Sequence, residues 1–176
     1  MRFCYADPPY LGVAQKHYGA LHDAAGDYDR PEVHAELIGR LIDEFPDGWA
    51  LSCSSPSLAV MLALCPADVR VMAWVKPFAS FKPGVGVAYA WEPVIVRGGR
   101  KRNREQDTVR DWVSANITLQ RGFPGAKPRA FALWIMDVLN VQCGDELIDM
   151  FPGSGAMQAA FDERLGDGKQ QLELMA

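Results

Sequence analysis

Apolar residues recur in short runs that predict strands and helices in alternation. Met1 to Ala6 is an apolar run typical of a buried strand. At 31–45 an apolar residue repeats every four positions (Val33, Leu37, Leu41, Phe45), which predicts a helix beginning at Pro31. The same reading predicts further strands at 49–53, 69–75, 87–96, 146–151 and 171–174, and further helices at 57–64, 129–140 and 156–165.

The order of these elements predicts an α/β fold with a mostly parallel sheet in three layers. A Gly- and Pro-rich connection without a helix joins the strands at 69–75 and 87–96. Because a parallel pair needs a long crossover, this connection predicts one antiparallel strand. Residues 11–30 are mixed and polar, and we expect a long loop there, of the kind that is often functional. The 176 residues suit a single domain, 1–176.

The composition is that of a globular protein, with 49% hydrophobic and 23% charged residues. No window has the ~18 uncharged apolar residues of a membrane span, and we see no secretory signal at the start. The cysteines are scattered, which disfavours disulfides and a zinc site and favours a reducing cytoplasm; they are Cys4, Cys53, Cys65 and Cys143. His17 and His22 lie without metal-ligand spacing, so we expect no metal.

The stretch Asp7-Pro8-Pro9-Tyr10 directly follows the first predicted strand. Each proline holds the preceding residue in an extended conformation and offers no N–H. The turn therefore presents an acid, free carbonyl groups and an aromatic ring at a strand's carboxyl end, where α/β sheets bind ligands. Such acceptors beside a stacking surface suit an exocyclic amino group on a flat ring. On its own, the stretch is also an ordinary turn signal.

A second motif, Asp149-Met150-Phe151-Pro152-Gly153-Ser154-Gly155, joins a predicted strand to a predicted helix. Glycines let a ligand approach the backbone, and a helix start supplies free N–H groups. Glu173 follows Gly155 by 18 positions, in the predicted last strand. Dinucleotide-binding folds use an acid in that place to hold a ribose.

Together these motifs resemble the S-adenosylmethionine-dependent amino-methyltransferases of DNA. That family has a catalytic Asp/Asn/Ser-Pro-Pro-aromatic motif and a cofactor motif Asp-x-Phe-x-Gly-Ser-Gly. It also has a Lys-Pro pair before the cofactor strand, as in Lys127-Pro128. The catalytic motif comes first here, which is the family's circularly permuted "beta" order. The resemblance implies a Rossmann-like methyltransferase fold, S-adenosylmethionine as cofactor and, from the acid-first motif, adenine N6 as the target.

The resemblance also implies a role for each motif residue. The catalytic group is Asp7, Pro8, Pro9 and Tyr10: the Asp7 carboxylate and the Pro8 carbonyl accept hydrogen bonds from the amine, and the Tyr10 ring stacks on the base. The cofactor is held by Asp149, Phe151, Pro152, Gly153, Ser154 and Gly155, with Glu173 on the ribose and Lys127 reaching the methionine carboxylate. The base has to leave double-stranded DNA first, and no cysteine nucleophile is needed.

The sequence Arg97 to Arg104, RGGRKRNR, opens a small basic insertion at about 97–126. We expect it to contact nucleic-acid phosphates, although a solvated loop is the alternative; the basic residues are Arg97, Arg100, Lys101, Arg102 and Arg104. Gly98 and Gly99 suggest a flexible loop. The net charge of −4 excludes a basic coat over the whole surface but leaves room for a local patch.

Other functions stay open at this point. The chain could be a catalytically inactive methyltransferase-like subunit, or an enzyme that methylates cytosine N4, RNA adenine or a protein glutamine. A nicotinamide oxidoreductase is disfavoured, because its glycine turn would not lie near the chain's end. The stretch between the motifs is short, so recognition of the target by a second subunit, including a second copy in a homodimer, also stays open.

Overall fold

The structure is a computed structural model that describes residues 1–20, 22–78, 84–117 and 126–175. Its elements follow in the order β1 (Arg2–Ala6), α1 (Ala14–Tyr18), the 3-10 helix η1 (Asp23–Asp29), α2 (Pro31–Glu44), β2 (Gly48–Ser52), α3 (Leu58–Leu64), β3 (Arg70–Val75), β4 (Trp91–Gly98), β5 (Trp112–Ser114), α4 (Arg129–Leu139), β6 (Glu146–Asp149) and α5 (Ala156–Met175).

The described strands form one sheet in the order β5-β3-β4-β2-β1-β6. β1 pairs in parallel with β2 and β6, and β3 pairs in parallel with β5. β4 pairs antiparallel with both β2 and β3, so β3 runs in the same direction as β2. The prediction of a mostly parallel sheet with one antiparallel strand is confirmed.

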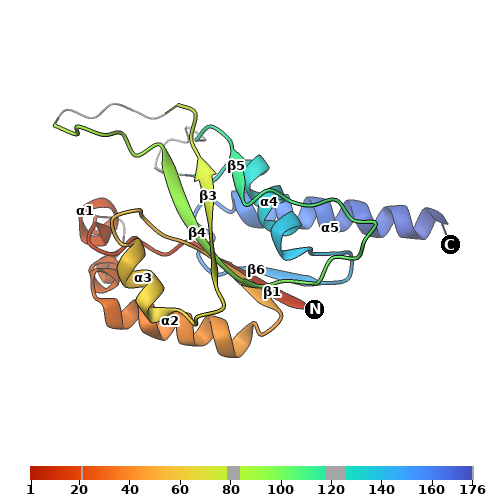
Figure 1. Ribbon diagram of the computed structural model, residues 1–176, viewed down its shortest axis with the longest axis horizontal. Coiled ribbons are helices and arrows are strands. Elements are labelled where there is room, and N and C mark those ends of the chain that lie inside the picture. Colours follow the sequence, from red (N-terminus) through yellow and green to blue (C-terminus); the bar gives the residue numbers. More distant parts are fainter. Residues whose placement is uncertain (21, 79–83, 118–125, 176) are drawn as a thin grey trace.

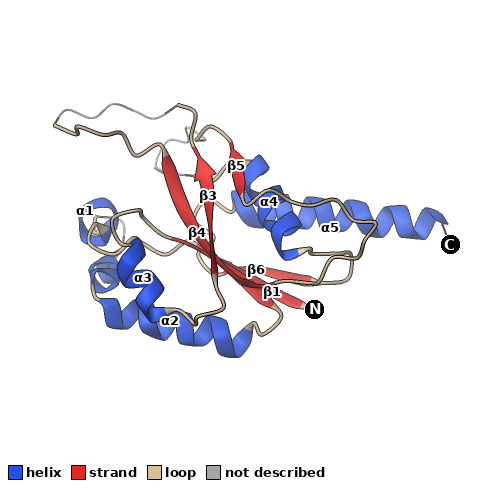
Figure 2. Ribbon diagram, in the orientation of Figure 1, coloured by secondary structure: helices blue, strands red, loops and turns tan. Residues whose placement is uncertain are grey.

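Helices cover both faces of the sheet, which confirms the three layers (Figures 1 and 2). Alternate residues of β1 point to opposite sides: Phe3 and Tyr5 pack with α4 and α5, whereas Cys4 and Ala6 pack with α2 and α3. All four side chains are fully buried. A strand covered on both faces has no polar side to show, which is why residues 3–6, after the exposed Arg2, read as a continuous apolar run.

The structure differs from the sequence prediction in three places. Residues 11–30 contain α1 and η1, and the Asp29 carboxylate joins them by accepting the backbone N–H groups of Ala14 and Gln15 at 2.9 and 3.0 Å. β5 was not predicted. The predicted turn at 166–169 and strand at 171–174 are wrong, because α5 continues to Met175. Gln, Leu and Glu at 170–174 are good helix formers, and local propensity decided that stretch.

The ends of the strands lie on two opposite sides of the sheet, which we call the carboxyl edge and the amino edge. The carboxyl edge holds the ends of β1, β2, β3, β5 and β6, together with the start of β4. The amino edge holds the opposite ends, where Gly48 of β2 pairs with Gly98 of β4. Asp7 and Asp149 therefore lie at the carboxyl edge, at the ends of neighbouring strands.

Candidate active site

The Asp-Pro-Pro-Tyr turn leaves β1 at the carboxyl edge. β1 remains bonded to the adjoining chain up to this point, where the Met150 N–H donates to the Tyr5 carbonyl at 3.0 Å. Pro8 is buried, and its carbonyl accepts no hydrogen bond from the described residues. The Pro8 carbonyl is thus an unpaired backbone acceptor next to Asp7 in the chain, although Pro8 is not among the residues that line the cavity described below. The Asp7 side chain is 25% exposed.

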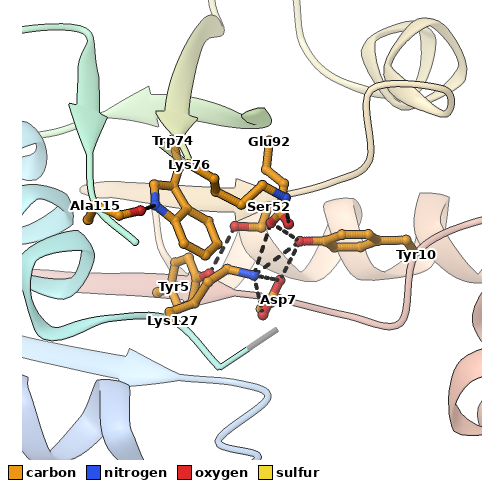
Figure 3. A network of polar contacts seen from close by, with 9 residues as sticks. All are labelled: Tyr5, Asp7, Tyr10, Ser52, Trp74, Lys76, Glu92, Ala115 and Lys127. Atoms are coloured by element: carbon orange, nitrogen blue, oxygen red, sulfur yellow. Dashed lines mark hydrogen bonds and ion pairs between the residues drawn. The ribbon is translucent and has the colours of Figure 1, made fainter. Parts of the chain in front are cut away.

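Lys127 lies against this turn, although it is 120 positions away in the sequence. Its Nζ donates to both Asp7 carboxylate oxygens at 3.0 and 2.8 Å and to the Tyr10 hydroxyl at 3.1 Å (Figure 3). Burial by itself would lower the pKa of Lys127. The nearby Asp7 carboxylate and other groups raise that pKa by more than burial lowers it, so it lies well above its ordinary value. Lys127 is a buried cation paired with Asp7. Its expected contact with the cofactor carboxylate stays a prediction.

Tyr10 points its hydroxyl into the same network. The hydroxyl lies 3.0 Å from an Asp7 oxygen and 2.9 Å from a Glu92 oxygen (Figure 3). Burial, together with the Asp7 carboxylate, raises the pKa of Tyr10 well above its ordinary value, so it stays a neutral phenol. Tyr10 thus lies beside Asp7 and hydrogen-bonds through its hydroxyl. Stacking of its ring on a base stays a prediction.

Glu92 and Lys76 complete the network and were missed from sequence. Glu92 Oε2 accepts from Lys127 at 3.3 Å, and Glu92 Oε1 accepts from Lys76 Nζ at 2.8 Å. Both side chains are mostly buried, with exposed fractions of 16% and 13%. A carboxylate inside an apolar predicted strand was the one signal available, since charged residues are seldom buried without a partner.

Buried polar groups support the site from below. Tyr5 shares a 2.9 Å hydrogen bond between its hydroxyl and that of Ser52, on the neighbouring strand. Trp74 donates its Nε1–H to the Ala115 carbonyl at 2.8 Å and presents its ring 5.3 Å from Lys127 Nζ. These contacts hold the rings of Tyr5 and Trp74 in fixed positions next to Lys127 (Figure 3).

The glycine motif forms the facing wall. Asp149 ends β6, and its carboxylate accepts the Phe151 N–H at 3.0 Å. Gly153 and Gly155 have φ values of +48° and +75°, which L side chains rarely adopt. A Cβ on Gly155 would meet no atom within 4 Å, so open space lies over this loop just before α5 begins.

Asp149 is an acid of this site whose pKa is shifted. Burial raises its pKa to about 6, and the neighbouring Asp7 carboxylate adds to the rise, against the hydrogen bond from Phe151. No cation lies within hydrogen-bond reach of its carboxylate in the described structure. The site therefore holds an acid that favours a positively charged ligand group.

Both motifs line one cavity of about 480 Å³. From the catalytic motif it takes Asp7, Pro9 and Tyr10, and from the cofactor motif Asp149, Phe151, Pro152, Gly153 and Ser154, with Lys127 between them. The lining also includes residues that sequence reasoning did not assign, namely Tyr5, Tyr18, His22, Glu92, Ala126, Met150, Ala156 and Met157. Tyr28 of η1 packs edge-on against Phe151, with 5.8 Å between ring centroids, so the predicted loop region supports the cofactor motif.

Glu173 lies within helix α5, so no strand carries it to this edge as predicted. Its assignment to a ribose stays a prediction without the strand on which it rested.

No helix in the described ranges is long and apolar enough to cross a membrane.

The basic residues 97–104 lie at the amino edge, away from the cavity. Arg100 donates to both oxygens of Asp145 at 2.6 and 2.7 Å, and Asp145 also binds the Met1 ammonium at 2.8 Å. Arg97 pairs with Asp68 at 2.9 Å. Arg102 donates to the backbone carbonyls of Asp107 and Asp137. Their assignment to nucleic acid stays a prediction, but the structure does not bring them near Asp7.

The glycines of this segment serve close packing. Gly98 and Gly99 both have positive φ, and the Gly99 N–H donates to the Asp47 carbonyl at 2.8 Å. A Cβ on Gly98 would lie 2.8 Å from that carbonyl oxygen and 2.9 Å from Gly48 Cα. The backbone therefore approaches β2 too closely for a side chain, which differs from the expected flexible loop.

The fold is shared with solved structures. The crystal structure of M1.HpyAVI in its SAM complex aligns with a TM-score of 0.59 and 15% identity, over 94% of this chain and 77% of that one. TTHA0409 of Thermus thermophilus, which bears the name of a DNA modification methylase, aligns with a TM-score of 0.54 and 18% identity, over 91% and 75%. Its complex with S-adenosyl-L-methionine aligns with a TM-score of 0.52. No protein-family model and no curated protein matches the sequence.

Proposed function

We propose that this protein is an S-adenosylmethionine-dependent methyltransferase that acts on the exocyclic N6 of adenine in DNA. The observation that carries the proposal is the single cavity into which an acid-Pro-Pro-Tyr turn and a glycine loop both open. Structures with this fold include one complexed with SAM and one named as a DNA modification methylase. The chain shares only their fold at these identities, so the chemistry rests on the cavity's own residues.

The glycine wall fits the cofactor. Open space over Gly155 leaves room for a ligand to lie against the backbone, and free N–H groups at the start of α5 favour a carboxylate. The buried Asp149 carboxylate suits the ammonium of the cofactor's amino-acid part. Once bound, the cofactor supplies a methyl group activated on a positively charged sulfur.

Asp7 and Pro8 fit the amine that receives the methyl group. An aromatic amino nitrogen is a poor nucleophile because its lone pair is delocalised into the ring. Two acceptors on its N–H bonds, the Asp7 carboxylate and the Pro8 carbonyl, favour the geometry in which that lone pair is localised. With the cofactor bound against the glycine loop, its methyl group would pass to this nitrogen, and the electron pair of the broken carbon–sulfur bond would stay with the cofactor. The Asp7 carboxylate takes the proton that nitrogen releases and passes it to solvent. Positioning supplies most of the acceleration.

The DNA is expected at the carboxyl edge, where the cavity lies. Residues 76–78 and 84–90, between β3 and β4, project from this edge (Figure 1), and we call them the β3–β4 arm. Phe78 and Tyr89 on this arm are 66% and 56% exposed. The sequence from Lys76 to Ala90 contains no acidic residue. Exposed aromatic rings on a segment that carries no acidic residue of its own suit the stacking of unpaired bases beside a flipped nucleotide.

Adenine is favoured over cytosine by the acid-first motif, through the resemblance alone. An inactive subunit is disfavoured because Asp7, Tyr10 and Lys127 form a connected network around the turn. Methylation of cytosine N4 or of RNA adenine would use the same acceptors, and these remain the alternative functions.

The test is incubation with labelled S-adenosylmethionine and unmethylated DNA, followed by mass spectrometry of the released nucleosides. We expect N6-methyladenine from the parent protein and none from Asp7→Ala. Label in N4-methylcytosine, or label transferred only to RNA, would replace adenine DNA with that substrate. Cofactor binding without transfer to any nucleic acid would identify an inactive subunit, and absence of cofactor binding would overturn the proposal.

A further inference from the structure

We infer that Glu92 is a positioning residue that draws hydrogen-bond donors away from Asp7, so that Asp7 keeps an acceptor site for the target amine. This inference rests on the proposed function, because it concerns how the acceptor of that amine is made available.

Glu92 is held in place from its own strand and from β3. It lies on β4 opposite Trp74, in the antiparallel pair that forms the carboxyl edge next to the cavity. One carboxylate oxygen accepts from Lys76 Nζ at 2.8 Å. The other oxygen faces Tyr10 and Lys127, at 2.9 and 3.3 Å (Figure 3). Lys76 therefore fixes one end of the carboxylate and aims the other at the catalytic turn.

The donors around Asp7 compete for its oxygens. Lys127 has three N–H bonds and Tyr10 has one O–H bond, while the acceptors within reach are the two Asp7 oxygens, Glu92 Oε2 and the Tyr10 oxygen. Without Glu92, the Tyr10 proton and two Lys127 protons would all fall on Asp7. With Glu92 present, the Tyr10 proton has a second acceptor that is equally near.

An entering amine can use this choice without any movement of heavy atoms. The Tyr10 oxygen lies 3.0 Å from Asp7 and 2.9 Å from Glu92, so rotation of its O–H moves the proton from one carboxylate to the other. Asp7 Oδ1, which accepts from both Tyr10 and Lys127, then regains a lone pair for the amine N–H. The exchange needs Glu92 to be ionised, because a protonated carboxyl would be a donor itself.

The surrounding charges keep Glu92 ionised. Burial alone would raise the pKa of Glu92, but the ammonium groups of Lys127 and Lys76 hold that pKa down at about 2. The network is electrically balanced, since the carboxylates of Asp7 and Glu92 face the ammonium groups of Lys76 and Lys127. Glu92 is thus a fixed anion across the pH range in which the reaction is measured.

The experiment compares Glu92→Gln in two backgrounds, the parent protein and Tyr10→Phe. In the parent background we expect kcat to fall about tenfold to a hundredfold, the scale of a misplaced reacting group, with cofactor Kd unchanged. In the Tyr10→Phe background the competing O–H is gone, so Glu92→Gln should cost less than about threefold. Glu146→Gln is the matched control, because Glu146 is an exposed glutamate paired with Arg2 at the amino edge.

The outcomes separate this inference from the proposed function. Equal losses in both backgrounds, accompanied by a lowered Tm, would make Glu92 a merely structural residue and overturn the inference. An unchanged kcat for Glu92→Gln would overturn it as well, while transfer by the parent protein keeps the proposed function intact. Absence of transfer by the parent protein would overturn both.

Discussion

Charged groups lie at both edges of the sheet, but the two edges arrange them differently. At the amino edge, Arg100 is bound to Asp145 and Arg97 to Asp68, each as a donor with its own acceptor. At the carboxyl edge, Lys127 is shared among Asp7, Tyr10 and Glu92 beside a cavity. A density of charge therefore does not identify a site by itself. A site is better identified by hydrogen-bond donors that are shared among several acceptors beside a cavity, because an entering ligand can change which acceptor each donor binds.

The difference follows from the topology. Parallel strands bring the chain segments after β1 and β6 to one edge, and the antiparallel β4 brings Glu92 there from the middle of the sequence. The same antiparallel strand, β4, carries Arg97 to the amino edge. The basic run that was expected to contact phosphates is thus directed away from the Asp-Pro-Pro-Tyr turn.

The largest expected effect comes from removing the acid at the carboxyl edge. Asp7→Ala should lower the rate of methyl transfer by about 10²- to 10⁴-fold, because it removes the acceptor of the amine proton. Cofactor affinity should stay within a few-fold, since Asp7 is assigned to the amine. Asp68→Ala, which removes an acid at the amino edge, is the control and should leave the rate unchanged. Rapid-quench measurement of transfer provides the check, and retained turnover in Asp7→Ala would reject the assignment.

A smaller effect is expected on the β3–β4 arm. Replacing Phe78 and Tyr89 together with Ala should weaken DNA binding by about 1–3 kcal/mol for each base that loses a stacking partner. The salt dependence of affinity should not change, because no phosphate contact is lost. Fluorescence anisotropy at several salt concentrations measures both quantities. Unaltered affinity would move the DNA to another part of the carboxyl edge.

Sequence predicted the parts of this molecule that depend on local pattern. Strands buried on both faces and the helix periodicity of α2 were read correctly, and both motifs were found at strand ends. The partners of Lys127 were not predictable, because they lie 120 and 35 positions away and depend on how β4 enters the sheet. The predicted strand at 171–174 is wrong because the spacing of Glu173 from the glycine motif was given more weight than the helix propensity of its neighbours. Gly98 and Gly99 were read as flexible, whereas the close approach of Gly98 to Asp47 and Gly48 leaves no room for a side chain there.

Stability should respond at the amino edge. Arg100→Ala removes a charged hydrogen-bond pair to Asp145, whose side chain is 5% exposed. We expect the free energy of unfolding to fall by about 1.5–3 kcal/mol, with cofactor affinity unchanged. Urea unfolding measures the first quantity and calorimetry the second. A variant as stable as the parent protein would show that Asp145 is satisfied by the Met1 ammonium alone.

Protonation of Asp149 should affect cofactor binding. Since burial raises the pKa of Asp149 to about 6, the ligand-free protein loses stability as pH rises from 3.8 toward that value. The ionised form is the one that binds an ammonium group, so cofactor affinity should rise with pH and level off above about 6. Below it, affinity should fall about tenfold per pH unit. Calorimetry from pH 5 to 8 tests this, and Asp149→Asn should lose the pH step.

The smallest effect is expected from Lys101 and Arg104. Both are exposed, and neither has an ion pair or hydrogen bond within the described ranges of the chain, so they are the cations of the 97–104 segment that are available for phosphate. If DNA lies across the carboxyl edge, replacing both with Ala should leave the slope of log affinity against log salt unchanged. If DNA also reaches the amino edge, the slope should become shallower by about 2, close to one unit for each phosphate contact. The double variant is a cleaner probe than one that includes Arg100 or Arg102, because those side chains hold the fold together and their loss would mix stability with binding. A shallower slope would restore the basic segment to the nucleic-acid interface, and would require the DNA to extend around the sheet from the cavity to Asp145.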